Sequence, residues 1–373
     1  MPLKILLTAD VHLGLKFAGY PQVQKELAEA RFETLRKTVT LANESQCDIF
    51  AVAGDLFDHL RLPDRDIILA AQIISQFQGR LAIVLPGNHD FIVPGESKVW
   101  PKFKSNAGDR VLLLEECKTY SLKHYDLDAN MYAGPCDAKH SKVNHVGWLK
   151  DEPKDPSVKY HIGLAHGSLQ GVSPDPDQSY YPMTEDELLK YGLDLWLLGH
   201  TDRMQYPQQV GPVHRIFYPG TPEPNGFDCD HEGKVWVIEV SEQKKIKATS
   251  VNTGKYRFLH EEVALSSNND IENLIRKYSA PEYQHALLKL KLKGRLPKES
   301  YESLSRIETD LEDRLLYIEV DTSEVKQAIT PESIDQEFTE ASFPHRVLTS
   351  LAQDTNADEA LQIAYDIIKE LRK

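Results

Sequence analysis

Five short hydrophobic segments of the chain each end in residues that could bind a divalent metal. The first three are followed by Asp10-Val11-His12, by Gly54-Asp55-Leu56-Phe57-Asp58 and by Gly87-Asn88-His89-Asp90. The last two are followed by His166-Gly167 and by Gly199-His200-Thr201-Asp202. Carboxylate, imidazole and amide groups suit ions such as Mn²⁺, Fe²⁺ or Zn²⁺, and the absence of cysteine from all five motifs argues against a thiolate zinc site. The series therefore predicts a divalent-metal centre.

A two-metal centre of this composition could hydrolyse phosphoesters. The two oxygens of Asp55 could bridge metals about 3.5 to 4 Å apart, and such a pair stabilises the attacking and leaving oxygens of an in-line displacement. Each motif alone occurs by chance in turns. Five of them in order, each at the end of an expected strand, are poorly explained by structural needs alone.

The segments between the motifs predict how these residues are positioned. Residues 49–53 and 81–85 are continuously apolar, as in strands covered on both faces, and they alternate with helical patterns at 22–43 and 64–77. Strand, helix and strand in alternation predict a sheet with crossovers, whose ligands collect at the carboxyl ends of the strands. The shorter, alternating strands within 111–160 and 215–240 predict a second, more antiparallel sheet packed on the first. The expected fold class is α/β, a two-sheet sandwich flanked by helices.

A change in composition near residues 254–260 predicts further domains. We expect a catalytic domain over 1–255, a small α/β cap over 256–325 and a helical tail over 326–373. The tail should hold two helices, one at 343–351 and one begun by Asn356 with Glu359 in a variant capping box. The second helix has an apolar stripe that could pack on its own domain or bind a partner. The stripe comprises Ala360, Leu361, Ala364, Ile367, Ile368 and Leu371.

The charge distribution bears on which partners are plausible. The chain has 373 residues and a net charge of −14, of which residues 299–340, with 13 acidic and 3 basic side chains, contribute −10. This balance argues against broad electrostatic binding of DNA, but not against a local site. In the segment 287–293, Lys289, Lys291 and Lys293 alternate with leucine. They could contact DNA phosphates or simply form a solvated strand face.

Other features predict a cytoplasmic protein. No apolar run is long enough to span a membrane, and the first strand begins so near the N-terminus that no room is left for a signal peptide. The four cysteines are far apart and include no C-x-x-C pair, which favours reduced thiols.

The five motifs resemble the pattern of the calcineurin-like metallophosphoesterase superfamily: D-x-H, G-D-x-x-D, G-N-H-D/E, H and G-H-x-H. The resemblance covers roughly residues 1–240. Within the superfamily, the SbcD-type nuclease subunits of double-strand-break repair are the most similar branch. The likeness lies in residues 8–14, in the Gly-Asp-Leu-Phe-Asp form of the second motif and in residues 218–223. Protein phosphatases are less similar, because their second motif is followed by Arg-Gly, where this chain has His59-Leu60.

The resemblance implies a role for each motif residue. Metal one would be held by Asp10, His12, Asp55 and the residue at position 202, and metal two by Asp55, Asn88, His166 and His200. His89 would contact the scissile phosphate and protonate the leaving oxygen, while Asp58 would orient His89. The expected cofactors are two divalent ions, Mn²⁺ first, with Mg²⁺ or Fe²⁺ as alternatives.

Asp202 departs from this pattern, which has histidine at its position. If Asp202 ligates metal one, its oxygen favours Mn²⁺ or Mg²⁺ over zinc. If it does not, a ligand position is vacant and the metal is weakly held. We expect ligation.

The resemblance implies a Mn²⁺-dependent DNA nuclease with exonuclease activity and, as a further expectation, endonuclease activity. It would act in DNA end processing and repair with an SbcC-type coiled-coil ATPase, and a homodimer is implied in the same way. Two alternatives are a metallophosphodiesterase acting on small nucleotides or phosphoesters, and a DNA-end-binding adaptor whose compromised metal site is weakly catalytic.

Overall fold

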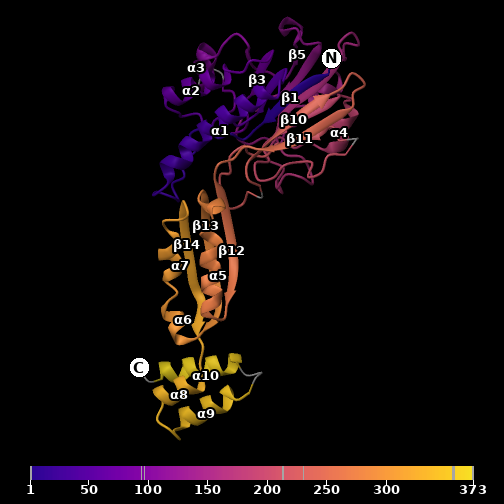
Figure 1. Ribbon diagram of the computed structural model, residues 1–373. Coiled ribbons are helices and arrows are strands. Elements are labelled where there is room, and N and C mark those ends of the chain that lie inside the picture. The colour runs from indigo at the N-terminus through magenta and orange to yellow at the C-terminus, as the bar shows by residue number, and fades with distance from the viewer. Residues whose placement is uncertain are drawn as a thin grey trace. The chain divides into compact units, whose positions relative to one another are not determined.

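The computed structural model describes residues 2–93, 95, 97–211, 214–229, 231–354 and 358–371. Asn356, expected to begin the last helix, lies outside these residues. The chain divides into two compact units, Met1–Phe258 and Leu259–Lys373 (Figure 1). The roles expected for the parts of the chain stay predictions.

The first unit contains a six-stranded sheet in the order β11-β10-β1-β2-β3-β4. Strands β1 to β4 are parallel, and β10 pairs antiparallel with β1, with Leu3 opposite Val240. The strands are β1 (Leu3–Thr8), β2 (Ile49–Ala53), β3 (Leu81–Leu85), β4 (Val111–Leu113), β10 (Lys234–Val240) and β11 (Ile246–Asn252). The crossovers contain α1 (Gln24–Glu44), α2 (Asp64–Ile74) and α3 (Val99–Asn106).

A second, five-stranded sheet has the order β5-β6-β7-β8-β9. Its strands are β5 (Thr119–Ser121), β6 (Ala129–Gly134), β7 (Tyr160–His166), β8 (Leu195–Gly199) and β9 (Ile216–Phe217). Short helices η1 (Lys123–Tyr125), η2 (Gly147–Lys150) and α4 (Glu185–Lys190) lie between them.

The expectation that the second sheet is more antiparallel was wrong. Strands β6 to β9 are parallel, and only β5 is antiparallel to its neighbour. Residues 234–240 were expected in this sheet, but they form β10 of the first sheet. In β10, Trp236, Ile238 and Val240 are buried in the core between the sheets, whereas Val237 and Glu239 on the other face are partly exposed. Such alternation does not indicate which sheet a strand joins.

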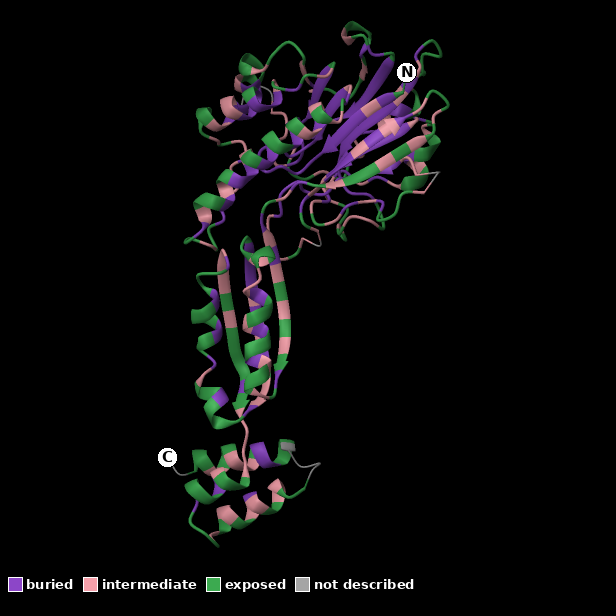
Figure 2. Ribbon diagram, in the orientation of Figure 1, coloured by how far each residue is buried: buried purple, intermediate pink, exposed green. Residues whose placement is uncertain are grey.

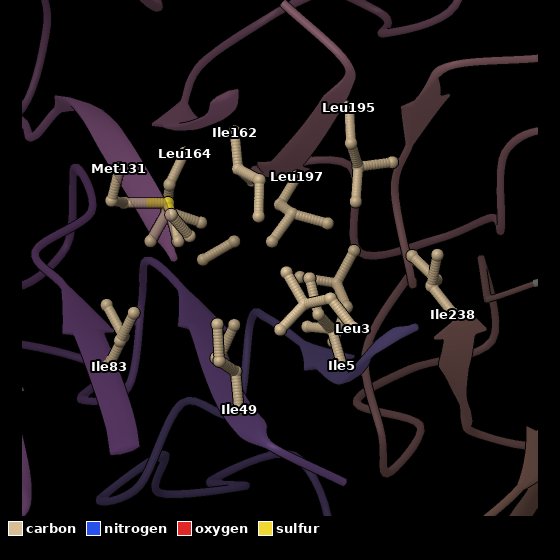
Figure 3. Packing of buried hydrophobic residues seen from close by; sticks show 14 of the residues in the cluster. Leu3, Ile5, Ile49, Ile83, Met131, Ile162, Leu164, Leu195, Leu197 and Ile238 are labelled. Carbon is tan, nitrogen blue, oxygen red and sulfur yellow. The ribbon is translucent and has the colours of Figure 1, made fainter. Parts of the chain in front are cut away.

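The main core lies between the two sheets. Ile5, Ile49 and Ile83 of the first sheet face Ile162 and Leu197 of the second (Figure 3), and none of the five is more than 1% exposed. The other face of the first sheet is covered by α1 to α3, so β2 and β3 are buried along their whole length (Figure 2). Burial on both faces explains their continuously apolar sequences. The predicted two-sheet α/β sandwich flanked by helices is confirmed.

The second unit begins with a three-stranded sheet in the order β12-β13-β14. Its core joins leucines of β13 to Ile271 of α5 and Ile307 of α7. The elements are β12 (Arg257–Leu265), α5 (Asn268–Tyr278), η3 (Pro281–Tyr283), β13 (Ala286–Leu296), α6 (Lys298–Glu302), α7 (Arg306–Leu311) and β14 (Tyr317–Gln327).

The described residues of the tail form three helices where two were expected: α8 (Pro331–Glu337), α9 (Phe343–Ala352) and α10 (Asp358–Glu370). The additional helix α8 has only seven residues, too few to show a helical period, and Thr330 caps it. The apolar stripe of α10 is divided. Leu361 is buried and Ile368 packs against the same small core, whereas Ile367 and Leu371 are 52% and 82% exposed. Within the described part of the chain, no helix has the length and apolarity to cross a membrane.

Candidate metal centre

The five motifs converge at one end of the sandwich, where strands of both sheets terminate. Strands β1, β2 and β3 lead into the first three motifs, while β7 and β8 lead into the last two. A cavity of about 290 Å³ is lined by His12, Leu15, Asp55, Asp58, Asn88, His89, Tyr180, His200, Asp202 and Asn225. Asp10 and His166, each 1% exposed, contact His200 and Asn88 of this lining. The structure thus brings together all nine predicted site residues of the first unit.

The backbone adopts left-handed conformations at four of these residues. The φ angles are 53° at Asp10, 47° at His12, 51° at Asp55 and 106° at His200. Side chains other than glycine rarely adopt this region, and such strain is retained mainly where function requires it. The first two motifs hold each other in place, because Asp10 N donates to Gly54 O at 3.1 Å and His12 N donates to Asp55 O at 3.0 Å.

Two motif glycines allow the loops to approach closely. A Cβ atom at Gly54, whose φ is 92°, would collide with the ring of His166. A Cβ atom at Gly87 would collide with the carboxylate of Asp55. Both glycines are therefore needed for packing of the site as well as for their turns.

Asp55 lies at the middle of the candidate ligands. Its Oδ2 is 3.7 Å from Nε2 of His12 and 3.4 Å from Nε2 of His166, and its Oδ1 accepts from His89 N at 2.8 Å. Potential ligand atoms of His12, Asp55 and His89 lie within 4.8 Å of one another, as do those of Asp10, Asp55 and His166. The two groups share Asp55, as a bridging carboxylate requires.

The atoms expected to hold metal two lie within hydrogen-bond distance of one another. His166 Nδ1 lies 2.9 Å from the carbonyl oxygen of Ala53, an acceptor that leaves Nε2 as the ligand atom. That Nε2 is 2.9 Å from Oδ1 of Asn88, and the same oxygen is 3.1 Å from Nδ1 of His200. Each of these two contacts requires a proton on the ring nitrogen or a cation between the two atoms. A divalent ion fits this donor set.

The electrostatics of the buried groups also fit a cation. Burial, together with the charges of Asp55 and Asp202, raises the pKa of Asp10 to about 8. Burial lowers the pKa of His166, but Asp55 outweighs burial and raises it to about 9. Burial would raise the pKa of Asp55 itself, but His166 lowers it below its ordinary value. Metal binding to such a cluster displaces protons.

His89 lines the cavity, and its side chain is 34% exposed. Its Nδ1 lies 2.9 Å from the main-chain carbonyl oxygen of Asp58, whereas the Asp58 carboxylate is 3.9 Å away. The same carboxylate is closer to His12, with 3.4 Å between Asp58 Oδ1 and His12 Nδ1. The acceptor for His89 is therefore the main-chain oxygen of Asp58 and not its carboxylate. The carboxylate faces His12, a candidate ligand of metal one.

Asp202 lines the cavity of the centre, although the family pattern has histidine at this position. Its carbonyl oxygen accepts from Thr221 N at 3.0 Å, and its Oδ2 accepts from the amide of Asn225 at 2.6 Å. Ligation of a metal by Asp202 stays a prediction.

The sequence model of the Calcineurin-like phosphoesterase family matches residues 3–204, more than half of the chain. The chain belongs to this family. Membership indicates a metal-dependent hydrolase of phosphoesters, in a family that binds two divalent metals, and the acidic and histidine groups around Asp55 are placed as such a centre requires.

Individual relatives are distant. The chain is 27% identical over 233 residues to the uncharacterized metallophosphoesterase YhaO of Bacillus subtilis, covering 58% of this chain and 52% of YhaO. It is 24% identical over 239 residues to the DNA double-strand break repair protein Mre11 of Methanopyrus kandleri, covering 59% and 48% of the two chains. The chain thus spans about half the length of these relatives. The calcineurin-like phosphoesterase YfkN of Bacillus subtilis superposes with a TM-score of 0.38 at 14% identity, over 68% of this chain and 91% of that one.

A buried arginine supports the first motif of this calcineurin-like phosphoesterase, and sequence reasoning missed it. Arg31 in α1 is fully buried and donates to Val11 O at 2.6 Å and to Glu223 O at 3.3 Å. The Glu223 carboxylate in turn accepts from the backbone of Lys255 and Tyr256 at 2.8 and 2.9 Å. Arg31 lies among charged residues of an amphipathic helix, so its sequence context gave no sign of burial.

Two further residues were also missed. Asp90 is fully buried and accepts from Gly87 N at 2.7 Å and Phe57 N at 2.9 Å, which joins the second and third motifs. Its place as the fourth residue of Gly-Asn-His-Asp was the available signal. Tyr180 lies in a loop without any motif, yet its ring packs 4.8 Å from that of His200 and lines the cavity.

The three lysines proposed for DNA contact lie on β13 in the second unit. Lys289 pairs with Glu319 at 3.1 Å and Lys291 with Glu324 at 2.5 Å, while Lys293 pairs with Glu262. Carboxylates of the neighbouring strands thus balance their charge. Their contact with DNA stays a prediction.

Proposed function

We propose that this phosphoesterase is a Mn²⁺-dependent DNA nuclease of the SbcD type, which hydrolyses phosphodiesters at DNA ends as an exonuclease and an endonuclease. The observation that carries the proposal is a cationic cleft adjoining the metal cavity. The cleft has a volume of about 1220 Å³ and lies between α1 and α2. Leu15 lines both the cleft and the metal cavity.

The charges of the cleft suit a polyanion. Its lining includes the cations Lys16, Lys25, Arg61 and Arg65 and the carboxylates of Glu29 and Asp66. Lys25 pairs with Glu29 at 3.8 Å and Arg65 with Asp66 at 3.3 Å, so the positive excess comes from Lys16 and Arg61. A local excess of positive charge is notable in a chain of net charge −14. Lysine and arginine contacts to phosphates hold DNA in register without reading its sequence. A strand bound at the metals could therefore continue along this cleft.

The proposed chemistry assigns Asp10, His12, Asp55 and Asp202 to metal one, and Asp55, Asn88, His166 and His200 to metal two. Bound dications would lower the pKa of a water molecule and offset the negative charge of the phosphodiester. His89, held at Nδ1 by the carbonyl oxygen of Asp58, would donate a proton from Nε2 to the leaving oxygen.

The proposal includes partners. The similarity to Mre11 of Methanopyrus kandleri, a DNA double-strand break repair protein, supports a role on DNA. From the resemblance of the motifs we further propose that the protein acts in the cytoplasm with an SbcC-type ATPase and a second copy of the chain. The exposed residues Ile363, Ile367 and Leu371 of the tail would contribute to the ATPase contact, and Lys289, Lys291 and Lys293 to DNA contact.

The test compares two substrates in Mn²⁺: linear duplex DNA and bis-p-nitrophenyl phosphate. Wild-type protein should cleave both. The double variant Arg61→Glu, Arg65→Glu should lose far more activity on DNA than on the small diester. The exposed pair Lys245→Glu, Lys247→Glu on the same unit, outside the cleft lining, is the matched control and should retain DNA cleavage. Hydrolysis of the small diester without DNA cleavage would instead support a small-molecule phosphodiesterase.

A further inference from the structure

The aspartate at position 202 is accompanied by a second residue outside the family pattern. Asn225 lines the same cavity as His12, His200 and Asp202. Its Nδ2 donates to Asp202 Oδ2 at 2.6 Å, the one hydrogen bond found for the carboxylate of Asp202 within the described residues. Asn225 thus contacts the residue whose identity departs from the pattern.

Three contacts join the loop of Asp202 to the loop of Asn225. The first is the bond between the two side chains. Thr221 N also donates to the carbonyl oxygen of Asp202 at 3.0 Å, and Arg203 pairs with Asp228 at 2.7 Å. The hydrogen bond from Thr221 holds the main chain of Asp202 in place, and the side-chain amide of Asn225 holds one oxygen of its carboxylate. The carboxylate is therefore held in one orientation at the wall of the cavity.

We propose that Asn225 is a positioning residue for metal one, which holds Asp202 so that its carboxylate replaces the histidine of the family pattern. The proposal rests on the two-metal centre of the proposed function. An aspartate is shorter than a histidine and its carboxylate rotates, so it ligates well only if a neighbour fixes it. With Oδ2 bound to Asn225, Oδ1 would be the atom that is available to the ion.

The pair also determines which ion is preferred. Metal one would have carboxylates from Asp10, Asp55 and Asp202 and a single imidazole from His12. Histidine at position 202 would give two carboxylates and two imidazoles. Oxygen ligands favour Mn²⁺ and Mg²⁺, whereas imidazole favours Zn²⁺, so the Asp202–Asn225 pair makes metal one selective for the harder ions.

The test measures metal binding directly. The full chain is titrated with Mn²⁺ by calorimetry, and bound Mn²⁺ is counted by electron paramagnetic resonance. Asn225→Ala should lower the affinity of one of two sites about 10- to 100-fold and leave the other unchanged. Asn144→Ala is the matched control, because Asn144 also donates to a carboxylate, Glu187 Oε2 at 2.7 Å, but does not line the cavity. It should leave both affinities unchanged.

A second background separates positioning from a general loss of structure. In Asp202→His protein the hydrogen bond from Asn225 to Asp202 Oδ2 no longer exists, so adding Asn225→Ala should change Mn²⁺ affinity little, and Zn²⁺ should bind more tightly than in wild type. Two sites with equal affinities in wild type and Asn225→Ala would overturn the role of Asn225 and leave the two-metal centre intact. An equal loss in both backgrounds would also overturn it. Fewer than two Mn²⁺ ions on wild-type protein would overturn both proposals.

Discussion

The main-chain carbonyl oxygen of Asp58 lies 2.9 Å from Nδ1 of His89, while the carboxylate of Asp58 is directed to His12. One residue therefore supports two histidines through different atoms. The backbone atom orients the proposed proton donor, and the side chain supports a proposed ligand of metal one. A substitution that changes the side chain of Asp58 but keeps its main-chain oxygen separates these two effects.

Asp58→Asn should weaken metal one rather than misplace His89. The amide keeps the size of the side chain but removes the charge that supports His12, and loss of such a partner lowers metal affinity about tenfold or more. Mn²⁺ titration should show one weakened site, and excess Mn²⁺ should restore most of the cleavage. Unchanged affinity with cleavage that excess Mn²⁺ cannot restore would show that the carboxylate acts on His89 instead.

Arg31→Met should destabilise the fold and weaken metal one. Removal of the buried guanidinium leaves the carbonyl oxygens of Val11 and Glu223 without their donor, and a buried acceptor left unsatisfied costs about 1 to 3 kcal/mol. Urea denaturation measures this change. Arg36→Met, at an exposed position of the same helix, should change the free energy of unfolding by no more than about 0.5 kcal/mol. Equal effects of the two substitutions would refute the role of Arg31.

The metal-free protein should lose stability as the pH rises from about 4 to about 9, and most steeply between about 6.5 and 8, where Asp10 and His166 both contribute. Asp10, with a pKa of about 8, and His166, with a pKa of about 9, both hold a proton in the folded state that they release more readily when unfolded. Their protonation stabilises the fold at low pH, and this contribution disappears as the pH rises through the folded pKa values. Urea midpoints in chelator should therefore fall over this range.

Saturating Mn²⁺ should remove that decline, because the ions replace the protons and bind more tightly as the pH rises. The same decline with and without Mn²⁺ would indicate that the ions do not bind at these residues.

The convergence of the motifs could be predicted from the sequence because each strand is buried on both faces and ends in a short loop. Residues such as Asp55 and Asn88 follow directly from such strands. The assignment of strands to sheets could not be predicted, because β10 has the same alternating pattern whichever sheet it joins. The site is built from strand ends of both sheets, with β1, β2 and β3 from the first and β7 and β8 from the second.

Residues far from any motif were beyond prediction for a different reason. Arg31, Tyr180 and Asn225 reach the centre only through tertiary contacts, and each has an ordinary local context in a helix or a loop. The tail shows the same limit. The stripe of α10 predicted an amphipathic helix, but which of its residues are buried depends on how α8 and α9 pack against it.

The most direct test of the proposed nuclease is His89→Ala, assayed on linear duplex DNA in excess Mn²⁺ with bound Mn²⁺ counted in the same samples. Loss of the proton donor should lower the rate of cleavage about 10²- to 10⁴-fold while two Mn²⁺ ions remain bound. His124→Ala, at an exposed histidine outside the cavity lining, should cleave at the wild-type rate. Cleavage by His89→Ala at the wild-type rate with both ions bound would contradict the account.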